Sequence, residues 1–261
     1  MRGAVHNAIK LVLIGLATGV FGGLFGIGGG VLMVPALVFL MGFDQRRAVG
    51  TTPIAMLPAA TAGLISYALQ GGFDWRAAIA LSIGVIVGAR IGLRLLNKLS
   101  LRALEIGFFV FLLLSIVSLW VVVPSRDDTI NMTPLVFVLL LVFGLIPGLA
   151  MSLLGVGGGI IAIPVLMVGF NASDLIAKGT SLCMVITGAI TSASKNIRMG
   201  NADIKAGAIL GVSAALVSPF SVQLAVLLSP QVANILFSLF LAFVASQYLV
   251  RILKQRKTAA K

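Results

Sequence analysis

The sequence predicts an all-α integral membrane protein built from two inverted-topology repeats, each a Gly-broken helical hairpin plus three transmembrane helices. Three observations predict this class: the composition, an internal duplication and the placement of basic residues. Of the 261 residues, 59% are hydrophobic and 10% are charged, and the mean hydropathy is +1.15. A soluble domain carries about 25% charged residues. The apolar surface of this chain therefore has to meet lipid.

The formal net charge of +12 does not indicate nucleic-acid binding. The basic residues lie between and after the apolar runs rather than on one amphipathic face, which is typical of the positive-inside bias of membrane proteins. We therefore expect the lipid bilayer, and no nucleic acid, among the partners. Cys183 is the only cysteine and lies within an apolar run, so no intrachain disulfide is expected.

An internal duplication accounts for nearly the whole chain. A shift of 129 places lays Gly15 on Gly144 and still lays Phe108 on Phe237. Chance does not keep one offset over so long a stretch. We therefore expect a first transmembrane repeat over residues 1–133 and a second over residues 134–261.

Each repeat is expected to contain one broken apolar run and three ordinary spans. The broken runs cover about 9–42 and 134–170, and the ordinary spans lie near 51–69, 77–97 and 103–123, then near 180–197, 206–227 and 232–250. At 1.5 Å per residue, such spans match a hydrocarbon core of about 30 Å. The part of the first run after its glycines is too short to cross. We expect each broken run to be a helical hairpin or a discontinuous helix.

The basic residues predict the orientation. We expect either form of the broken run to give an odd number of crossings per repeat, so that the two repeats insert with opposite orientations. With the N-terminus in the cytoplasm, only Arg76, Arg126 and Lys178 of the 19 Lys and Arg face outward. The positive-inside rule selects this topology, in a cytoplasmic membrane with both termini cytoplasmic. Inverted repeats with a broken helix in each half are a recurrent plan of secondary transporters.

Two glycine clusters, 26–30 (GIGGG) and 155–159 (GVGGG), are the sharpest functional signal. Glycine lets the backbone leave helical geometry and exposes successive N–H groups. The helices that resume at Val31 and Ile160 would point their positive N-terminal ends into the break, which suits an anion. The alternative is that these glycines only allow close packing of helices.

Polar residues of the later spans complete the candidate site. Thr51 and Thr52 in one repeat, and Thr180 and Ser181 in the other, are interpreted as helix starts with hydroxyl caps. Plain capping and a ligand role for these hydroxyls both remain open. Lys195 follows a stripe of hydroxyl residues on its helix; it either reaches an anion or extends to the interface. Arg90 and Arg94 are interpreted as topological anchors, with attraction of anions at the cytoplasmic mouth as the alternative.

Titratable residues are scarce. Glu105 is the only glutamate, all six aspartates lie in loops or at span ends, and His6 precedes the first span. Without mid-membrane carboxylates or imidazoles, a metal or organic cation would lack ligands, and a membrane hydrolase would lack its base. We expect no enzyme activity, no cofactor and no metal site. We also expect any proton coupling to reside in the substrate, with Lys195 as the one exception.

The pattern GLFGIGGGVLMVPAL, repeated as SLLGVGGGIIAIPVL, resembles the sulfite exporter TauE/SafE family. The segments Gly50-Thr51-Thr52, Gly179-Thr180-Ser181 and 200–203 (GNAD) match later positions of that family. The resemblance implies export or uptake of sulfite, organosulfonates or related small anions.

The sequence therefore predicts a secondary transporter, permease or exporter, of a small anion, with sulfite, an organosulfonate or a related sulfur oxyanion as the substrate. An anion channel and a non-transporting membrane subunit of an enzyme complex are the alternatives, and a homodimer is left open. The predicted substrate-binding residues are Gly28, Gly29, Gly30, Thr51, Thr52, Gly157, Gly158, Gly159, Thr180, Ser181, Lys195 and Asn196.

Overall fold

The computed structural model describes residues 2–96, 98–118, 120 and 129–259, and within these ranges it contains ten α-helices and no strand. The all-α prediction is confirmed. The helices are α1 (Arg2–Phe25), α2 (Gly30–Leu40), α3 (Gln45–Leu69), α4 (Trp75–Leu96), α5 (Leu101–Ser118), α6 (Pro134–Leu154), α7 (Gly159–Phe170), α8 (Asp174–Arg198), α9 (Ile204–Leu227) and α10 (Pro230–Ala259).

Six of these helices are long and apolar enough to cross a membrane: α1 from His6, α3, α4, α6, α8 and α9, each with 20 to 25 residues. Their outward faces carry large apolar side chains, such as Leu216 and Phe220, which are 67% and 70% exposed. Such a surface requires lipid. Over the described residues, α5 and α10 are not among the six, although the sequence analysis expects both to span.

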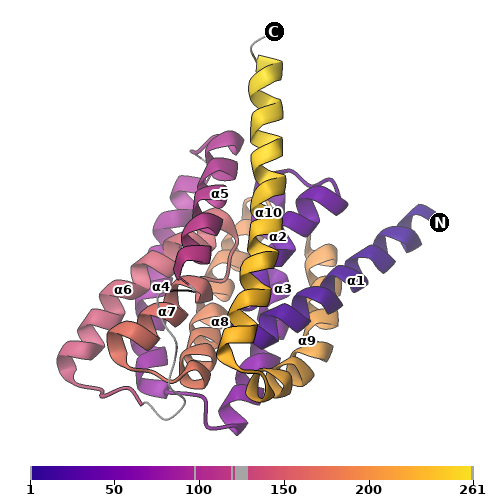
Figure 1. Cartoon of the computed structure of the whole chain (residues 1–261). Coiled ribbons are helices and arrows are strands. Elements are labelled where there is room, and N and C mark those ends of the chain that lie inside the picture. The colour runs from indigo at the N-terminus through magenta and orange to yellow at the C-terminus, as the bar shows by residue number, and fades with distance from the viewer. Residues whose placement is uncertain (1, 97, 119, 121–128, 260–261) are drawn as a thin grey trace.

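Each glycine cluster reverses the direction of the chain. α1 descends and α2 ascends in Figure 1, and they meet at the turn 26–29. A Cβ built on Gly29 would lie 3.0 Å from Thr18 O, and one built on Gly158 would lie 2.8 Å from Pro147 Cβ. Such contacts require the chain to fold back. The broken runs are therefore hairpins. Only hairpins leave an odd number of crossings per repeat, so the expectation that a discontinuous helix would do the same is wrong.

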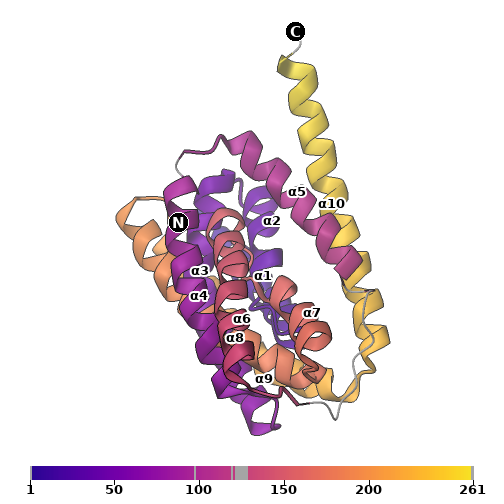
Figure 2. The ribbon, with the colours of Figure 1, turned by 90° about the vertical axis from the view of Figure 1, so that its left-hand side faces the viewer.

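The two halves of the chain interlock rather than pack as separate bodies. α1 lies along α9 and α4 lies along α6, while α3 contacts both α8 and α9. Small residues allow these close approaches: a Cβ built on Gly15 would lie 2.6 Å from Leu210 O, and one built on Gly84 would lie 2.9 Å from Gly144 Cα. Figure 2 shows α5 and α10 side by side at one edge of the bundle. Each hairpin therefore packs against a helix of the other half.

The starts of α3 and α8 differ from the sequence prediction. α3 begins at Gln45 and α8 at Asp174, so the four hydroxyl residues lie inside these helices. The caps are Asp44, whose Oδ1 accepts from Arg47 N at 3.0 Å, and Ser173, whose Oγ accepts from Ile176 N at 3.3 Å. The interpretation of Thr51, Thr52, Thr180 and Ser181 as capping residues is wrong, because the polar turn before each of them is already helical.

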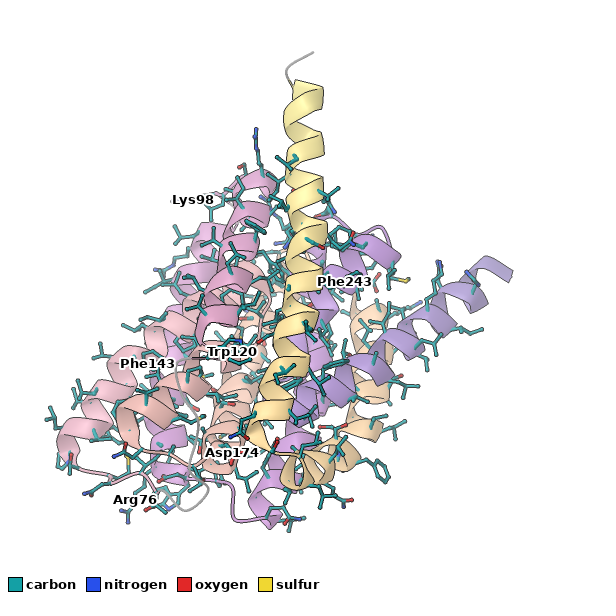
Figure 3. The ribbon with its side chains drawn as sticks, in the orientation of Figure 1. Arg76, Lys98, Trp120, Phe143, Asp174 and Phe243 are labelled. Carbon is teal, nitrogen blue, oxygen red and sulfur yellow. The ribbon has the colours of Figure 1, made fainter. Side chains whose placement is uncertain are left out.

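Charged residues mark the two ends of the molecule. In Figure 3, Lys98 lies near the upper end, whereas Arg76 and Asp174 lie near the lower end. The sequence analysis assigns Lys98 and Arg76 to opposite sides of the bilayer, and their separation agrees with that assignment. Which end faces the cytoplasm, and the inverted orientation of the two repeats, stay predictions.

Candidate functional site

The two glycine breaks meet in the core. A Cβ built on Gly30 would lie 2.6 Å from Gly155 O and 3.0 Å from Gly157 N, and one built on Gly159 would lie 3.0 Å from Gly26 O. Every residue of both clusters is buried. Of the six predicted glycines, Gly30, Gly157 and Gly159 lie at this contact. Gly28 packs on Val185, and Gly29 and Gly158 pack on Thr18 and Pro147 of their own hairpins.

The backbone of both breaks needs glycine. The φ angles are 69° at Gly28, 77° at Gly29 and 70° at Gly158, a left-handed region that other residues rarely adopt. Gly29 and Gly158 are the N-caps of α2 and α7, and neither has a side chain that could accept from the first-turn N–H groups. The positive ends of the two short helices therefore begin at the same central contact.

The hydroxyls of Ser181 and Thr52 differ in their partners. Ser181 Oγ lies 2.7 Å from Gly26 O and 2.8 Å from Lys178 O, and it donates to one of these carbonyls. It therefore joins α8 directly to the first glycine break. Thr52 is fully buried, and its Oγ1 donates to Ala48 O on its own helix at 2.8 Å.

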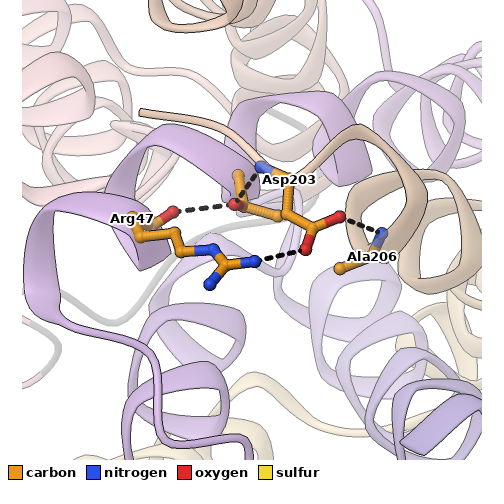
Figure 4. Close-up of polar contacts among 4 residues, drawn as sticks. Arg47, Asp203 and Ala206 are labelled. Carbon is orange, nitrogen blue, oxygen red and sulfur yellow. Dashed lines mark hydrogen bonds and ion pairs between the residues drawn. The ribbon is translucent and has the colours of Figure 1, made fainter. Parts of the chain in front are cut away.

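Thr51 and Thr180 form equivalent joints between the two halves. Thr51 Oγ1 accepts from Asp203 N at 2.9 Å and donates to Arg47 O at 2.7 Å (Figure 4). Thr180 Oγ1 accepts from Asp74 N at 3.1 Å. Each threonine comes from one half and its aspartate partner from the other. The hydroxyl of Thr51 both donates and accepts, so its visible role is to hold the halves together.

An ion pair reinforces the first of these joints. Arg47 Nη2 lies 2.7 Å from Asp203 Oδ2, while Asp203 Oδ1 accepts from Ala206 N at 3.0 Å (Figure 4). The hydrogen bond from Ala206 N–H is the main reason why the pKa of the Asp203 carboxyl lies below its ordinary value; burial opposes this, and the Arg47 guanidinium adds to the lowering.

Lys195 does not lie at the glycine breaks. It is exposed near the C-terminal end of α8, whereas Ser181, which contacts the first break, lies near the N-terminal end. Its side chain lines a surface groove of about 470 Å³ together with Arg90, Arg94 and Arg198. The groove gathers four basic side chains from α4 and α8.

Asn196 is fully buried and lies beside the second hairpin. Its Nδ2 donates to Ser192 O at 2.9 Å, and Ser192 Oγ is 3.2 Å from the hydroxyl of Ser152 in the last turn of α6. Asn196 Oδ1 has no hydrogen-bond partner among the described residues. The asparagine thus presents an unused acceptor inside the protein.

A buried charged pair lies outside the predicted set of site residues. Lys178 Nζ lies 3.2 Å from Asp174 Oδ2, and the side chains are only 10% and 3% exposed. A Cβ built on Gly26 would lie 2.5 Å from Lys178 Cβ, so the lysine packs directly on the first glycine break. The assignment of Lys178 to the outer side of the membrane stays a prediction, but its side chain is buried in the protein rather than solvated. The i, i+4 spacing of Asp174 and Lys178 indicates an ion pair, but only if the helix is known to start at Asp174.

The pair bears on the expectation about proton coupling, which named Lys195 as the one exception. That expectation stays a prediction, and Asp174 and Lys178 are further titratable side chains that it did not consider. Asp174 lies at a helix start, as predicted, but it is 2% exposed rather than solvated. A buried carboxylate and a buried ammonium therefore lie in the first turns of α8, whose Lys178 packs on the first glycine break.

Comparison with known proteins places the chain in a family. A family model described as sulfite exporter TauE/SafE matches residues 2–119 and 140–261. The probable membrane transporter protein YunE of Bacillus subtilis (strain 168) is 32% identical over 109 residues, which cover 42% of this chain and 40% of that protein. The chain thus spans about two fifths of the length of YunE.

Two further relatives align over more of the chain. The probable membrane transporter protein MJ0441 of Methanocaldococcus jannaschii is 28% identical over 162 residues, which cover 60% of each chain. A probable membrane transporter protein of Haemophilus influenzae is 27% identical over 187 residues, covering 68% of this chain and 69% of the relative. No solved structure matches the chain. With six helices suited to crossing a bilayer and a family match along both halves, this multi-pass membrane protein belongs to the sulfite exporter TauE/SafE family of membrane transporters.

Proposed function

We propose that the protein is a secondary transporter of a small anion, with sulfite, an organosulfonate or a related sulfur oxyanion as its substrate. The observation that carries the proposal is the contact between the two glycine breaks, where Gly30 begins α2 and Gly159 begins α7. Two helix N-termini that begin at one buried contact supply N–H donors and partial positive charge from both halves of the chain.

The closed packing of the breaks suggests how access would alternate. In this conformation Gly30 and Gly155 are too close to admit an anion between them. The hairpins come from different halves, and each packs on a helix of the other half. A movement of one hairpin with its partner helix would open the contact toward one side of the membrane, and the equivalent movement of the other half would open it toward the other side.

The basic groove fits a role at the cytoplasmic end. In the proposed topology both termini are cytoplasmic, and the groove formed by Arg90, Arg94, Lys195 and Arg198 lies on the cytoplasmic side. Four cations around one depression raise the local concentration of anions. The groove would therefore collect substrate before it enters the protein.

Sulfur oxyanions are the substrate class because of the family description, while the curated relatives are named only as membrane transporters. A cationic substrate would be repelled by the positive helix ends at the breaks, and a neutral substrate would gain nothing from their charge. We propose no enzymatic activity.

A thermal-shift screen of the purified protein against sulfite, sulfate, thiosulfate, taurine and sulfoacetate tests the proposal. Binding to the folded state raises the unfolding temperature, and above the Kd the rise follows the logarithm of the ligand concentration. We expect at least one sulfur anion to stabilise the protein in this concentration-dependent way, and chloride at the same ionic strength to have no such effect. Equal behaviour of every anion, including chloride, would contradict the proposed substrate class.

A further inference from the structure

We propose that Lys178 binds the negative charge of the transported anion, and that Asp174 holds the lysine in place when no anion is bound. The inference rests on the proposed function, because it concerns the same site, and it assigns the charge recognition to a residue pair outside the predicted set. It also distinguishes Lys178 from the exposed Lys195 on the same helix.

The position of Lys178 is fixed at the glycine break. Its Cβ and Cγ lie 2.5 Å and 2.8 Å from a Cβ built on Gly26. Ser181 Oγ lies within hydrogen-bond distance of both Gly26 O and Lys178 O, which ties the helix turn to the break. The lysine stem is flexible, so its ammonium can move from a carboxylate to a nearby anion without a shift of the backbone. Lys178 is thus a buried lysine whose stem packs on the first glycine break, with its ammonium held at Asp174 at the end of that flexible stem.

Asp174 is poised as an exchangeable partner. Only its Oδ2 contacts Lys178, and its Oδ1 has no hydrogen-bond partner among the described residues, although the residue is 2% exposed. A buried carboxylate is normally satisfied at both oxygens, because an unmet acceptor costs free energy. Among the described residues, Lys178 is the one hydrogen-bonding partner of this carboxylate, so few contacts are lost when the ammonium turns from Asp174 to an incoming oxyanion.

The first half of the chain shows that the hairpin does not need the charges. At the positions 129 places earlier, Gln45 stands for Asp174 and Val49 stands for Lys178. Gly155 packs on Val49, with a built Cβ 3.0 Å from Val49 Cα, just as Gly26 packs on Lys178. The same close approach is therefore made by an uncharged residue. The charges of the pair in the second half are not required for this packing. Lys178 supplies a single positive charge, which suits the binding of one anion.

Binding measurements on the purified full chain test the inference, with sulfite and methanesulfonate as probes. Lys178→Met should raise the Kd by about tenfold or more, because a charge-assisted contact is lost. Asp174→Asn should lower the Kd, because the competing carboxylate is gone. Lys205→Met, an equal loss of one lysine from the exposed first turn of α9, is the matched control and should leave the Kd unchanged.

Lys178→Met leaves a buried carboxylate unpaired and could unfold the protein. The double variant Asp174→Asn/Lys178→Gln keeps the number of non-hydrogen atoms in both side chains and removes both charges. It should unfold at nearly the parent temperature and bind neither probe. A folded double variant that binds like the parent would overturn the inference, as would a folded Asp174→Asn variant that binds as weakly as Lys178→Met. If the parent itself binds neither probe, the proposed substrate class fails, and the inference fails with it.

Discussion

The hydroxyl of Thr51 accepts a hydrogen bond from the backbone N–H of Asp203 at 2.9 Å, although 152 residues separate them in sequence. The equivalent bond joins Thr180 to Asp74 at 3.1 Å. Shifting Thr51 by 129 places gives Thr180, and the same shift takes Asp74 to Asp203. Two equivalent hydrogen bonds therefore join the halves, each from the backbone N–H of an aspartate in one half to the hydroxyl of a threonine in the other.

Replacing either threonine by valine should destabilise the protein. Thr51→Val keeps the shape of the side chain but leaves the N–H of Asp203 without its acceptor, a loss of about 1–3 kcal/mol. Thr180→Val should act similarly through Asp74. Thr61→Val is the control, since Thr61 is exposed and bonds only to a carbonyl of its own helix. The midpoint of thermal unfolding in detergent measures the effect. Equal midpoints for Thr51→Val and Thr61→Val would show that the joint contributes nothing.

Alanine at the breaks should abolish anion binding without preventing membrane insertion. Gly29→Ala and Gly158→Ala place a Cβ on backbone with φ near 77° and 70° and within about 3 Å of Thr18 O and Pro147 Cβ. Gly169→Ala is the matched control, because the only atom near its built Cβ is 3.9 Å away. Ligand-induced thermal stabilisation reports binding. If the anion stabilises both variants as much as the parent, these glycines serve only the packing of the helices.

The joint between Arg47 and Asp203 should respond to acid. The folded-state pKa of Asp203 is lowered, so its contribution to stability is complete above the unfolded value of about 3.9 and is lost as the pH falls through the folded value. Asp203→Asn should therefore be less stable than the parent at neutral pH, and the difference should shrink in acid below that range. Thermal unfolding of both proteins across this range measures it. If the difference in unfolding temperature between the parent and Asp203→Asn stays constant with pH, the pKa of Asp203 is not lowered by folding.

The topology can be tested with single cysteines in a Cys183→Ser background. Asn131→Cys should react with an impermeant thiol reagent added to intact cells, whereas Lys98→Cys should react only after the cells are opened. Both positions are exposed in the structure, so accessibility within the fold does not limit the reaction. Labelling of Lys98→Cys from outside would contradict the predicted cytoplasmic placement of the termini.

The sequence predicts the fold better than the site. The glycine clusters and the spans occur at equivalent positions in both repeats. A break or span that is ambiguous in one repeat can therefore be recognised from its counterpart in the other. The start of α3 was missed because Gln45, Arg46 and Arg47 resemble a loop, whereas Gln45 is buried and accepts from Tyr248 OH at 3.0 Å. That bond depends on α10, which local patterns do not reveal.

The same limit hid the charged pair. Asp174 and Lys178 stand just before the expected span, where charges are ordinarily solvated. They are buried because this part of α8 packs on the first half of the chain, with Lys178 on Gly26 and Leu175 on Gly72. Conversely, Lys195 follows a stripe of hydroxyl residues that indicated a substrate-binding role, but its side chain lines a surface groove. Local patterns give the type of a residue but not which face of a long helix meets the other half of the chain.

Transport in proteoliposomes tests the central claim most directly. The purified protein should take up radiolabelled sulfite in a saturable manner, with inhibition by excess unlabelled sulfite, and the Gly158→Ala variant should not exceed protein-free vesicles. Saturation at a defined concentration distinguishes a transporter from a channel. Parent protein that moves no more sulfite or organosulfonate than empty vesicles, or a flux that rises linearly without limit, would contradict the account.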